Sequence, residues 1–92
     1  MPLPFAPMTL HRPARPGWAC ECCRLAWPCL NGRRDLAAEF AGRPAFLLYY
    51  MSAQLVEYMS DSPEQDGTLA AAMLYPRFIA WVWPATAPAR AA

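Results

Sequence analysis

The stretch Trp18-Ala-Cys20-Glu-Cys22-Cys23-Arg-Leu-Ala-Trp27-Pro28-Cys29 contains all four cysteines of this 92-residue chain. Cys20 and Cys23 have the C-x-x-C spacing with which two thiolates chelate one metal ion, and Cys29 follows five residues later. His11, the one histidine, lies upstream of them. The stretch therefore predicts a site in which three sulfurs and one imidazole bind a single ion.

The predicted metal ligands are His11, Cys20, Cys23 and Cys29, with Cys22 as the alternative ligand. Adjacent cysteines cannot easily point at the same ion, so His11 is favoured over Cys22 as the fourth ligand, although it must reach across a proline-rich segment. Zinc is the expected metal, because structural zinc sites take four thiolate and imidazole ligands.

The chain is short enough for its hydrophobic core to need a staple. Residues 1–16 contain five prolines, and residues 84–92 read Pro-Ala-Thr-Ala-Pro-Ala-Arg-Ala-Ala. We expect an irregular tail at 1–16 and a disordered tail at 84–92. A single metal-binding helical domain is predicted at residues 17–83. A core of this size is marginal, and a metal ion that binds only the folded loop stabilises it.

Hydrophobic spacing predicts helices after the cysteine loop. Asn31-Gly32 indicates a turn, and a helix is expected over residues 33–41 before Gly42 ends it. From Pro44 to about Ser60, apolar residues recur at intervals of three and four, which is the strongest helical pattern in the chain.

Further helices are expected towards the C-terminus. Residues 62–65 have the form of a capping box, and Thr68 is expected to cap a helix that runs to Tyr75. Pro76 then kinks this helix or starts a separate short one. The predicted fold class is mainly α: a small zinc-stabilised N-terminal loop, or knuckle, followed by three or four short helices.

Charge is unevenly distributed along the chain. The first 34 residues carry five arginines and one glutamate, and the remainder carries three arginines and six acidic residues. Compensation of the negative charge of a Cys₃His zinc site is favoured over nucleic-acid contact as the explanation, because the basic run is short. The residues predicted to contact nucleic acid or another partner in the alternative case are Arg12, Arg15, Arg24, Arg33 and Arg34.

The composition argues against several catalytic chemistries. The chain has no lysine, so it offers neither a Schiff-base nor a phosphate-loop lysine. Its one histidine is already assigned to the metal, which leaves no second base for a cysteine nucleophile. The acidic residues near the end of the long helix fit helix caps and surface charge. No catalytic residue is predicted, and a non-enzymatic role is favoured.

The sequence predicts a cytoplasmic protein that does not associate with membranes. The N-terminus lacks the basic start and unbroken apolar run of a signal peptide. The longest apolar stretch, residues 45–59, is interrupted by polar residues and is shorter than the ~20 residues of a membrane span. Reduced thiols in the cytoplasm favour metal binding over disulfides.

The spacing of Cys20, Cys23 and Cys29 is similar to the C-x-x-C-x5-C core of WhiB-like iron–sulfur proteins, which are small transcriptional regulators. This chain lacks that family's separate upstream cysteine and its Gly-Val/Ile-Trp-Gly-Gly turn. The resemblance implies an iron–sulfur cluster as the alternative to zinc, with His11 or Cys22 as the remaining ligand.

A broader pattern resembles a group of small uncharacterised high-GC bacterial proteins that are often labelled "flavin reductase". The pattern is carried by Arg15 to Trp18, Cys20, Cys23, Trp27 to Cys29, Arg33, Leu36, Glu39, Phe40, Leu74, Tyr75, Arg77, Phe78 and Trp81. Arg24 replaces the group's usual glycine, and Pro76 interrupts its last helix. The resemblance implies a shared fold and metal site. Flavin reduction is not expected, because the chain has no Gly-rich loop to hold a phosphate.

The predicted function is that of a zinc-binding small helical protein acting as a binding or regulatory module, with another protein as its partner. One alternative is a nucleic-acid-binding transcriptional regulator. The other is a redox protein, either an iron–sulfur sensor or a flavin reductase-like oxidoreductase.

Overall fold

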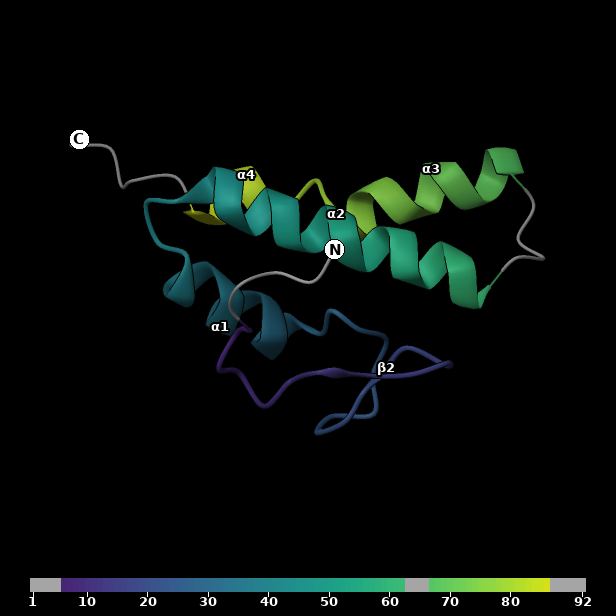
Figure 1. The fold of residues 1–92 in the computed structure, drawn as a ribbon, viewed down its shortest axis with the longest axis horizontal. Helices are drawn as coiled ribbons and strands as arrows, with labels where there is room; N and C mark the ends of the chain where they lie inside the picture. Colours follow the sequence, from purple (N-terminus) through teal and green to yellow (C-terminus); the bar gives the residue numbers. More distant parts are fainter. Residues whose placement is uncertain (1–5, 63–66, 87–92) are drawn as a thin grey trace.

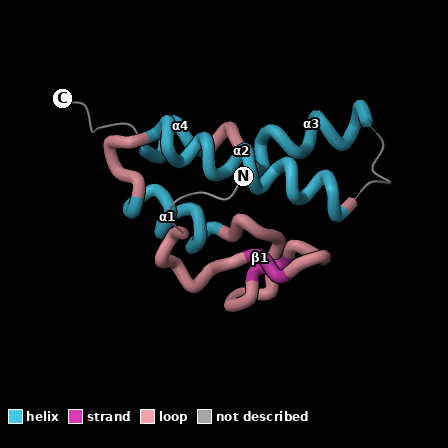
Figure 2. The backbone as a smooth tube through the Cα atoms, in the orientation of Figure 1, coloured by secondary structure: helices cyan, strands magenta, loops and turns pink. Residues whose placement is uncertain are grey.

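The computed structural model describes residues 6–62 and 67–86, with the side chains of α3 described from Ala72 onwards. In chain order the elements are β1 (Pro13–Ala14), β2 (Ala19–Cys20), α1 (Leu30–Glu39), α2 (Pro44–Asp61), α3 (Gly67–Phe78) and α4 (Val82–Thr86). Figure 1 shows α2, α3 and α4 above α1 and the cysteine loop. Helices make up most of the regular structure (Figure 2), so the mainly α prediction is confirmed.

The start of α1 differs from the prediction because a cysteine caps it. Asn31 and Gly32, interpreted as a turn, lie in the first turn of α1. The Sγ of Cys29 accepts a hydrogen bond from the backbone N–H of Gly32 at 3.3 Å. This cap satisfies one of the free N–H groups at the helix start, and α1 therefore begins at Leu30, three residues earlier than predicted.

The central helix α2 agrees with its predicted range. It begins at Pro44, where the fixed φ of proline suits the first helical position, and it ends at Asp61. Leu47 and Met51 on its inner face are fully buried. The spacing of the apolar residues in the sequence thus predicts the range of α2 correctly.

The C-terminal helices are divided at a different point from the predicted one. Pro76 lies inside α3, which continues to Phe78, and α4 starts at Val82. The backbone N–H groups of Ile79 and Ala80 both donate to the carbonyl of Tyr75, which closes the end of α3. The predicted capping box extends outside the described residues.

The first residues of the described chain pack against the helices. The backbone N–H groups of Met8 and Thr9 donate to the carboxylate of Glu39 at 2.7 and 3.0 Å. Pro13 then pairs with Cys20 in the two-stranded antiparallel sheet. The irregular tail predicted for residues 1–16 therefore contains a strand at Pro13–Ala14. A strand of two residues is too short to leave an alternating pattern in the sequence. At the other end, α4 continues to Thr86, beyond the predicted domain boundary at residue 83.

The core joins the cysteine loop to the helices through aromatic rings. Trp18 and Trp27 from the loop meet Phe78 of α3, with ring centroids between 5.9 and 6.2 Å apart. All three side chains are buried. The guanidinium of Arg77 donates from Nε to the Trp27 carbonyl at 2.8 Å and from Nη2 to the Trp18 carbonyl at 3.3 Å. One side chain of α3 thus satisfies two carbonyls of the loop.

In the part of the chain that the structure describes, no helix is both long enough and apolar enough to cross a membrane.

A second tie connects the loop to the end of α2. Arg15 donates to both carboxylate oxygens of Asp61, at 2.7 and 2.8 Å, and Trp18 Nε1 donates to Asp61 Oδ2 at 2.7 Å. The hydrogen bond from Arg15, with that from Trp18, lowers the pKa of Asp61 from 3.8 to about 2. The ionised carboxylate is therefore the form that holds the loop against α2.

We expect Asp61→Asn to destabilise the fold at neutral pH, because the amide has no charge and cannot accept from Arg15 at both atoms. A carboxyl whose pKa is lower in the folded state stabilises above its unfolded pKa and loses that effect as pH falls through its folded pKa. The difference between wild type and variant should thus be complete above about pH 3.8 and shrink towards about pH 2. Urea unfolding at several pH values measures it.

Glu57→Gln is the matched control for this measurement. Glu57 also pairs with Arg15, at 2.9 Å, but its side chain is half exposed, and exposed ion pairs contribute little. A loss of stability as large in Glu57→Gln as in Asp61→Asn would contradict the role given to Asp61.

Candidate metal centre

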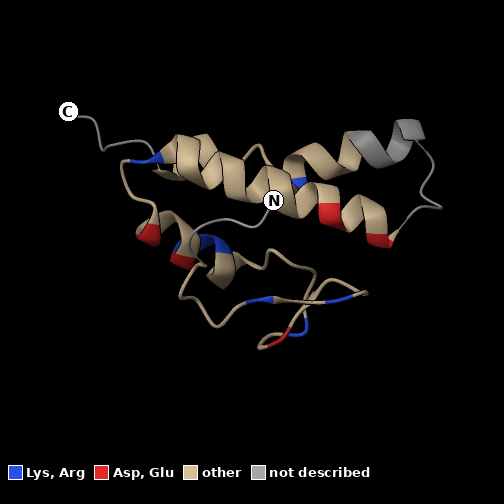
Figure 3. Ribbon diagram, viewed as in Figure 1, with Lys and Arg blue, Asp and Glu red and all other residues tan. Residues whose placement is uncertain are grey.

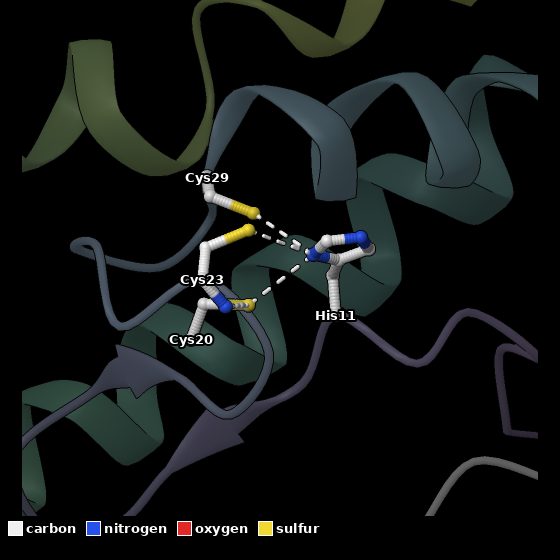
Figure 4. A group of neighbouring side chains, drawn as sticks. All are labelled: His11, Cys20, Cys23 and Cys29. Atoms are coloured by element: carbon white, nitrogen blue, oxygen red, sulfur yellow. Dashed lines mark hydrogen bonds between the residues drawn. The ribbon is translucent and has the colours of Figure 1, made fainter.

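Three sulfurs surround one imidazole nitrogen at the junction of the loop and α1. His11 Nδ1 lies 3.3 Å from the Sγ atoms of Cys20 and Cys23 and 3.4 Å from that of Cys29. All four ligand atoms lie within 4.8 Å of one another (Figure 4). Zinc–sulfur and zinc–nitrogen bonds of ~2.3 and ~2.0 Å at tetrahedral angles place sulfur and nitrogen ~3.5 Å apart. The nitrogen–sulfur distances therefore match those around one tetrahedral ion.

Cys22 lies apart from this group, on the surface. Its Sγ donates to the carbonyl of Leu10 at 3.1 Å, and its side chain is exposed. Adjacent residues in the knuckle turn their side chains in different directions, so Cys23 points towards the imidazole and Cys22 does not. The structure thus brings together the four residues proposed from the sequence and leaves the alternative ligand outside.

A short hairpin carries His11 to the cysteines. The pairing of Pro13 with Cys20 folds the proline-rich segment back on the loop, and Glu21 N–H donates to the Arg12 carbonyl at 2.8 Å. The His11 carbonyl accepts from Trp27 Nε1 at 2.9 Å. Because the segment reverses direction, the His11 imidazole faces the three sulfurs from the side opposite to the knuckle (Figure 4).

The residues before His11 are anchored to α1 by the side chains of Asp35 and Glu39, which sequence reasoning did not assign to the site. Thr9 Oγ1 accepts from the His11 N–H at 3.1 Å and donates to Asp35 Oδ2 at 2.6 Å. Glu39, one turn further along α1, accepts from the backbone of Met8 and Thr9. The i, i+4 spacing of the two acids places them on one face of α1. This spacing is visible in the sequence, but it does not indicate which groups the two carboxylates bind.

The knuckle itself requires an unusual backbone conformation. Arg24 N–H donates to the Cys20 carbonyl at 2.9 Å, and Arg24 adopts a φ of 64°, in the left-handed region. Glycine occupies that region freely, whereas a side chain adds strain there. Arg24 therefore holds the knuckle in a conformation that glycine would adopt without strain.

The thiols of Cys20 and Cys23 have pKa values that are shifted in opposite directions. Burial disfavours the Cys20 thiolate, but backbone N–H groups of Cys23 and Cys22 and the His11 side chain outweigh it, and the pKa falls from 9.0 to about 7. Burial and the neighbouring sulfurs of Cys29 and Cys20 raise the pKa of Cys23 to about 11. A divalent cation removes this conflict, because a coordinating thiol is deprotonated.

The start of α1 adds both charge and close packing to the site. Cys29 is the N-cap residue of α1 and lies at the positive end of the helix dipole. A Cβ at Gly32 would lie 3.2 Å from His11 Cβ and 3.4 Å from Cys29 Sγ. Gly32 therefore allows the imidazole to approach α1 closely enough to reach the sulfurs.

The five arginines proposed as partner contacts have different environments. Arg15 binds Asp61, Arg12 Nε donates to the Thr9 carbonyl at 3.1 Å, and Arg33 Nε donates to the Pro28 carbonyl at 3.2 Å. Arg24 and Arg34 are exposed. Figure 3 shows the basic positions spread along the loop and over α1. Three of the five thus hold the chain together, and contact with nucleic acid stays a prediction.

Comparison with protein-family models, curated proteins and solved structures found no match for this chain. The two resemblances noted in the sequence therefore stay predictions, and the site is interpreted from its own geometry.

We expect Gly32→Ala to weaken the fold and its metal site, although alanine is the better helix former by about 1 kcal/mol. The new methyl group presses on His11 Cβ, which cannot move without displacing the imidazole. Gly17→Ala is the control, because a Cβ there meets nothing within 4 Å. Thermal melting and chelator competition should show losses for Gly32→Ala alone. Equal behaviour of the two variants would contradict the close approach.

Arg24→Gly should stabilise the protein, because it removes the left-handed strain of about 1–2 kcal/mol. The greater freedom of glycine in the unfolded chain offsets part of this, so a net gain of about 0.5–1 kcal/mol is expected. The same change in the middle of α1, Arg34→Gly, should cost about 1 kcal/mol. Denaturant unfolding of both variants measures the two effects, and a loss in Arg24→Gly would contradict the strain.

Proposed function

We propose that this chain binds one structural zinc ion through His11, Cys20, Cys23 and Cys29 and serves as a small binding or regulatory module with a protein partner. The observation that carries the proposal is the convergence of four ligand atoms within 4.8 Å. A Cys₃His set of this kind is a common structural zinc site.

The surroundings of the site favour a structural over a catalytic role. Catalytic zinc keeps one position open for water or substrate, whereas the four side chains here would fill all four positions of a tetrahedral ion. The exposed fractions of Cys20 and Cys29 are 1% and 4%, and Trp18 and Trp27 pack in the same core cluster. An ion held here is largely screened from solvent, and its main effect is to fix the loop against the helices.

The spacing also favours a single ion over an iron–sulfur cluster. A cluster places several iron and sulfide atoms between its ligands and so spreads them further apart than one ion does. The contacts of 3.3 to 3.4 Å between His11 Nδ1 and the three sulfurs leave room for one ion. Zinc fits three thiolates and an imidazole without any redox change.

The test is the metal content of freshly purified protein combined with two cysteine variants. Wild type and Cys22→Ser should each contain one equivalent of zinc and melt at similar temperatures, because Cys22 lies outside the group. Cys20→Ser should lose the zinc and much of its helical circular dichroism, since binding and folding are linked. His11→Ala should bind with lower affinity.

Cobalt substitution provides a check that is independent of stability. Cobalt in a Cys₃His tetrahedron gives intense visible bands and a sulfur-to-metal charge-transfer band. Full zinc occupancy with unchanged melting in Cys20→Ser would overturn the site. A brown protein that contains iron and sulfide would show that the site binds an iron–sulfur cluster and not zinc.

A further inference from the structure

The outward face of α2 is apolar and exposed. Phe46, Tyr49 and Val56 are 56%, 56% and 61% exposed, and Ala53 completes their spacing of three and four residues. At 3.6 residues per turn these positions lie on one stripe, opposite the buried Leu47 and Met51. We call Phe46, Tyr49, Ala53 and Val56 the outer stripe.

The outer stripe is unusual for a helix on the surface of a small protein. A surface helix normally opposes its core face with charged residues, and a helix that is apolar all round is normally buried. The charged residues of α2 are Glu57 and Asp61, both in its last turns. Among the described helices, α3 and α4 are those that pack most against α2, on its inner side. The outer stripe thus has the composition of a covered surface.

We propose that the outer stripe is a homodimer interface, in which α2 of one copy packs antiparallel against α2 of a second copy, with the two-fold axis near Ala53. A two-fold interface requires a surface that complements itself. Ala53 supplies a small side chain at the axis, where the two helices approach most closely. Phe46, Tyr49 and Val56 then interdigitate on either side of it.

Charges at the ends of α2 fit this antiparallel arrangement. Rotation about Ala53 sets residue 49 of one helix level with residue 57 of the other, so the Tyr49 hydroxyl can donate to the Glu57 carboxylate. Arg43, at the cap before Pro44, comes level with the other helix just past Asp61. The basic start of each helix thus meets the acidic end of the other, where Arg15 offsets one of the two negative charges of Glu57 and Asp61, and the two helix dipoles oppose each other favourably. A parallel pair would place like charges together.

The area and shape of the face are sufficient for a weak dimer. Each exposed aromatic or large aliphatic side chain contributes on the order of 100 Å². With Met59, which is 54% exposed one turn after Val56, the four large side chains of each copy bury roughly 800 Å² in total, which lies in the range of a weak interface. A hollow of about 170 Å³, lined by Glu39, Phe40, Arg43 and Phe46, lies at the start of α2. The antiparallel pairing brings the Met59 end of the other helix to this hollow.

Sedimentation velocity of the full chain over a range of concentrations tests the proposal. Wild type should change from monomer to dimer with a Kd in the micromolar range, as expected for an interface of this size. Val56→Arg should be monomeric throughout, because it introduces two like charges into the apolar contact. Arginine is a better helix former than valine, and position 56 is exposed, so the monomer should keep its melting behaviour.

Two further variants separate the interface from general effects of charge. Ala38→Arg adds the same charge at an exposed site on α1 and should dimerise as wild type does. Arg43→Glu should weaken the dimer several-fold, since it places an acid opposite the acidic end of α2. An unchanged dimer in Arg43→Glu would overturn the antiparallel arrangement. A wild type that is monomeric at all concentrations, or a dimer that persists in Val56→Arg, would overturn the interface.

Discussion

The convergence of three sulfurs on the His11 imidazole is the contact on which the rest of the structure depends. It joins three pieces of chain: the segment before β1 that carries His11, the knuckle at the end of β2, and the start of α1. None of these has enough regular structure to be stable alone, since the two strands have two residues each. A shared ion would give them one common point, and the cost of ordering the loop would be offset by metal binding.

The loop is also fixed to the helices by buried rings and by two charged residues. Arg77 donates hydrogen bonds to the carbonyls of Trp18 and Trp27. Asp61 accepts hydrogen bonds from Arg15 and from the Trp18 indole. Trp18 therefore belongs to both ties. The Cys–His group organises the loop internally, and these contacts determine which face of the loop meets α2 and α3.

This division of roles leaves the surface of α2 available. The inner face of α2 carries the core, and the metal loop closes the fold from the side of α1 (Figure 1). The outer stripe is mostly exposed and contributes little to either. If metal binding stabilises the loop, as proposed, this part of the longest helix is left for association.

The sequence by itself determined which four residues form the Cys–His group and where the main helix lies. The C-x-x-C spacing and the single histidine are local in the chain, and the apolar period of α2 is a property of one segment, so both can be interpreted without knowing the fold. Tertiary structure decided the rest. Asn31 and Gly32 are helical because the Cys29 sulfur caps α1. The residues before His11 are ordered because Glu39 and Asp35 bind them. A glycine is needed at position 32 because His11 packs against it. These depend on contacts between residues far apart in sequence, which no local pattern encodes.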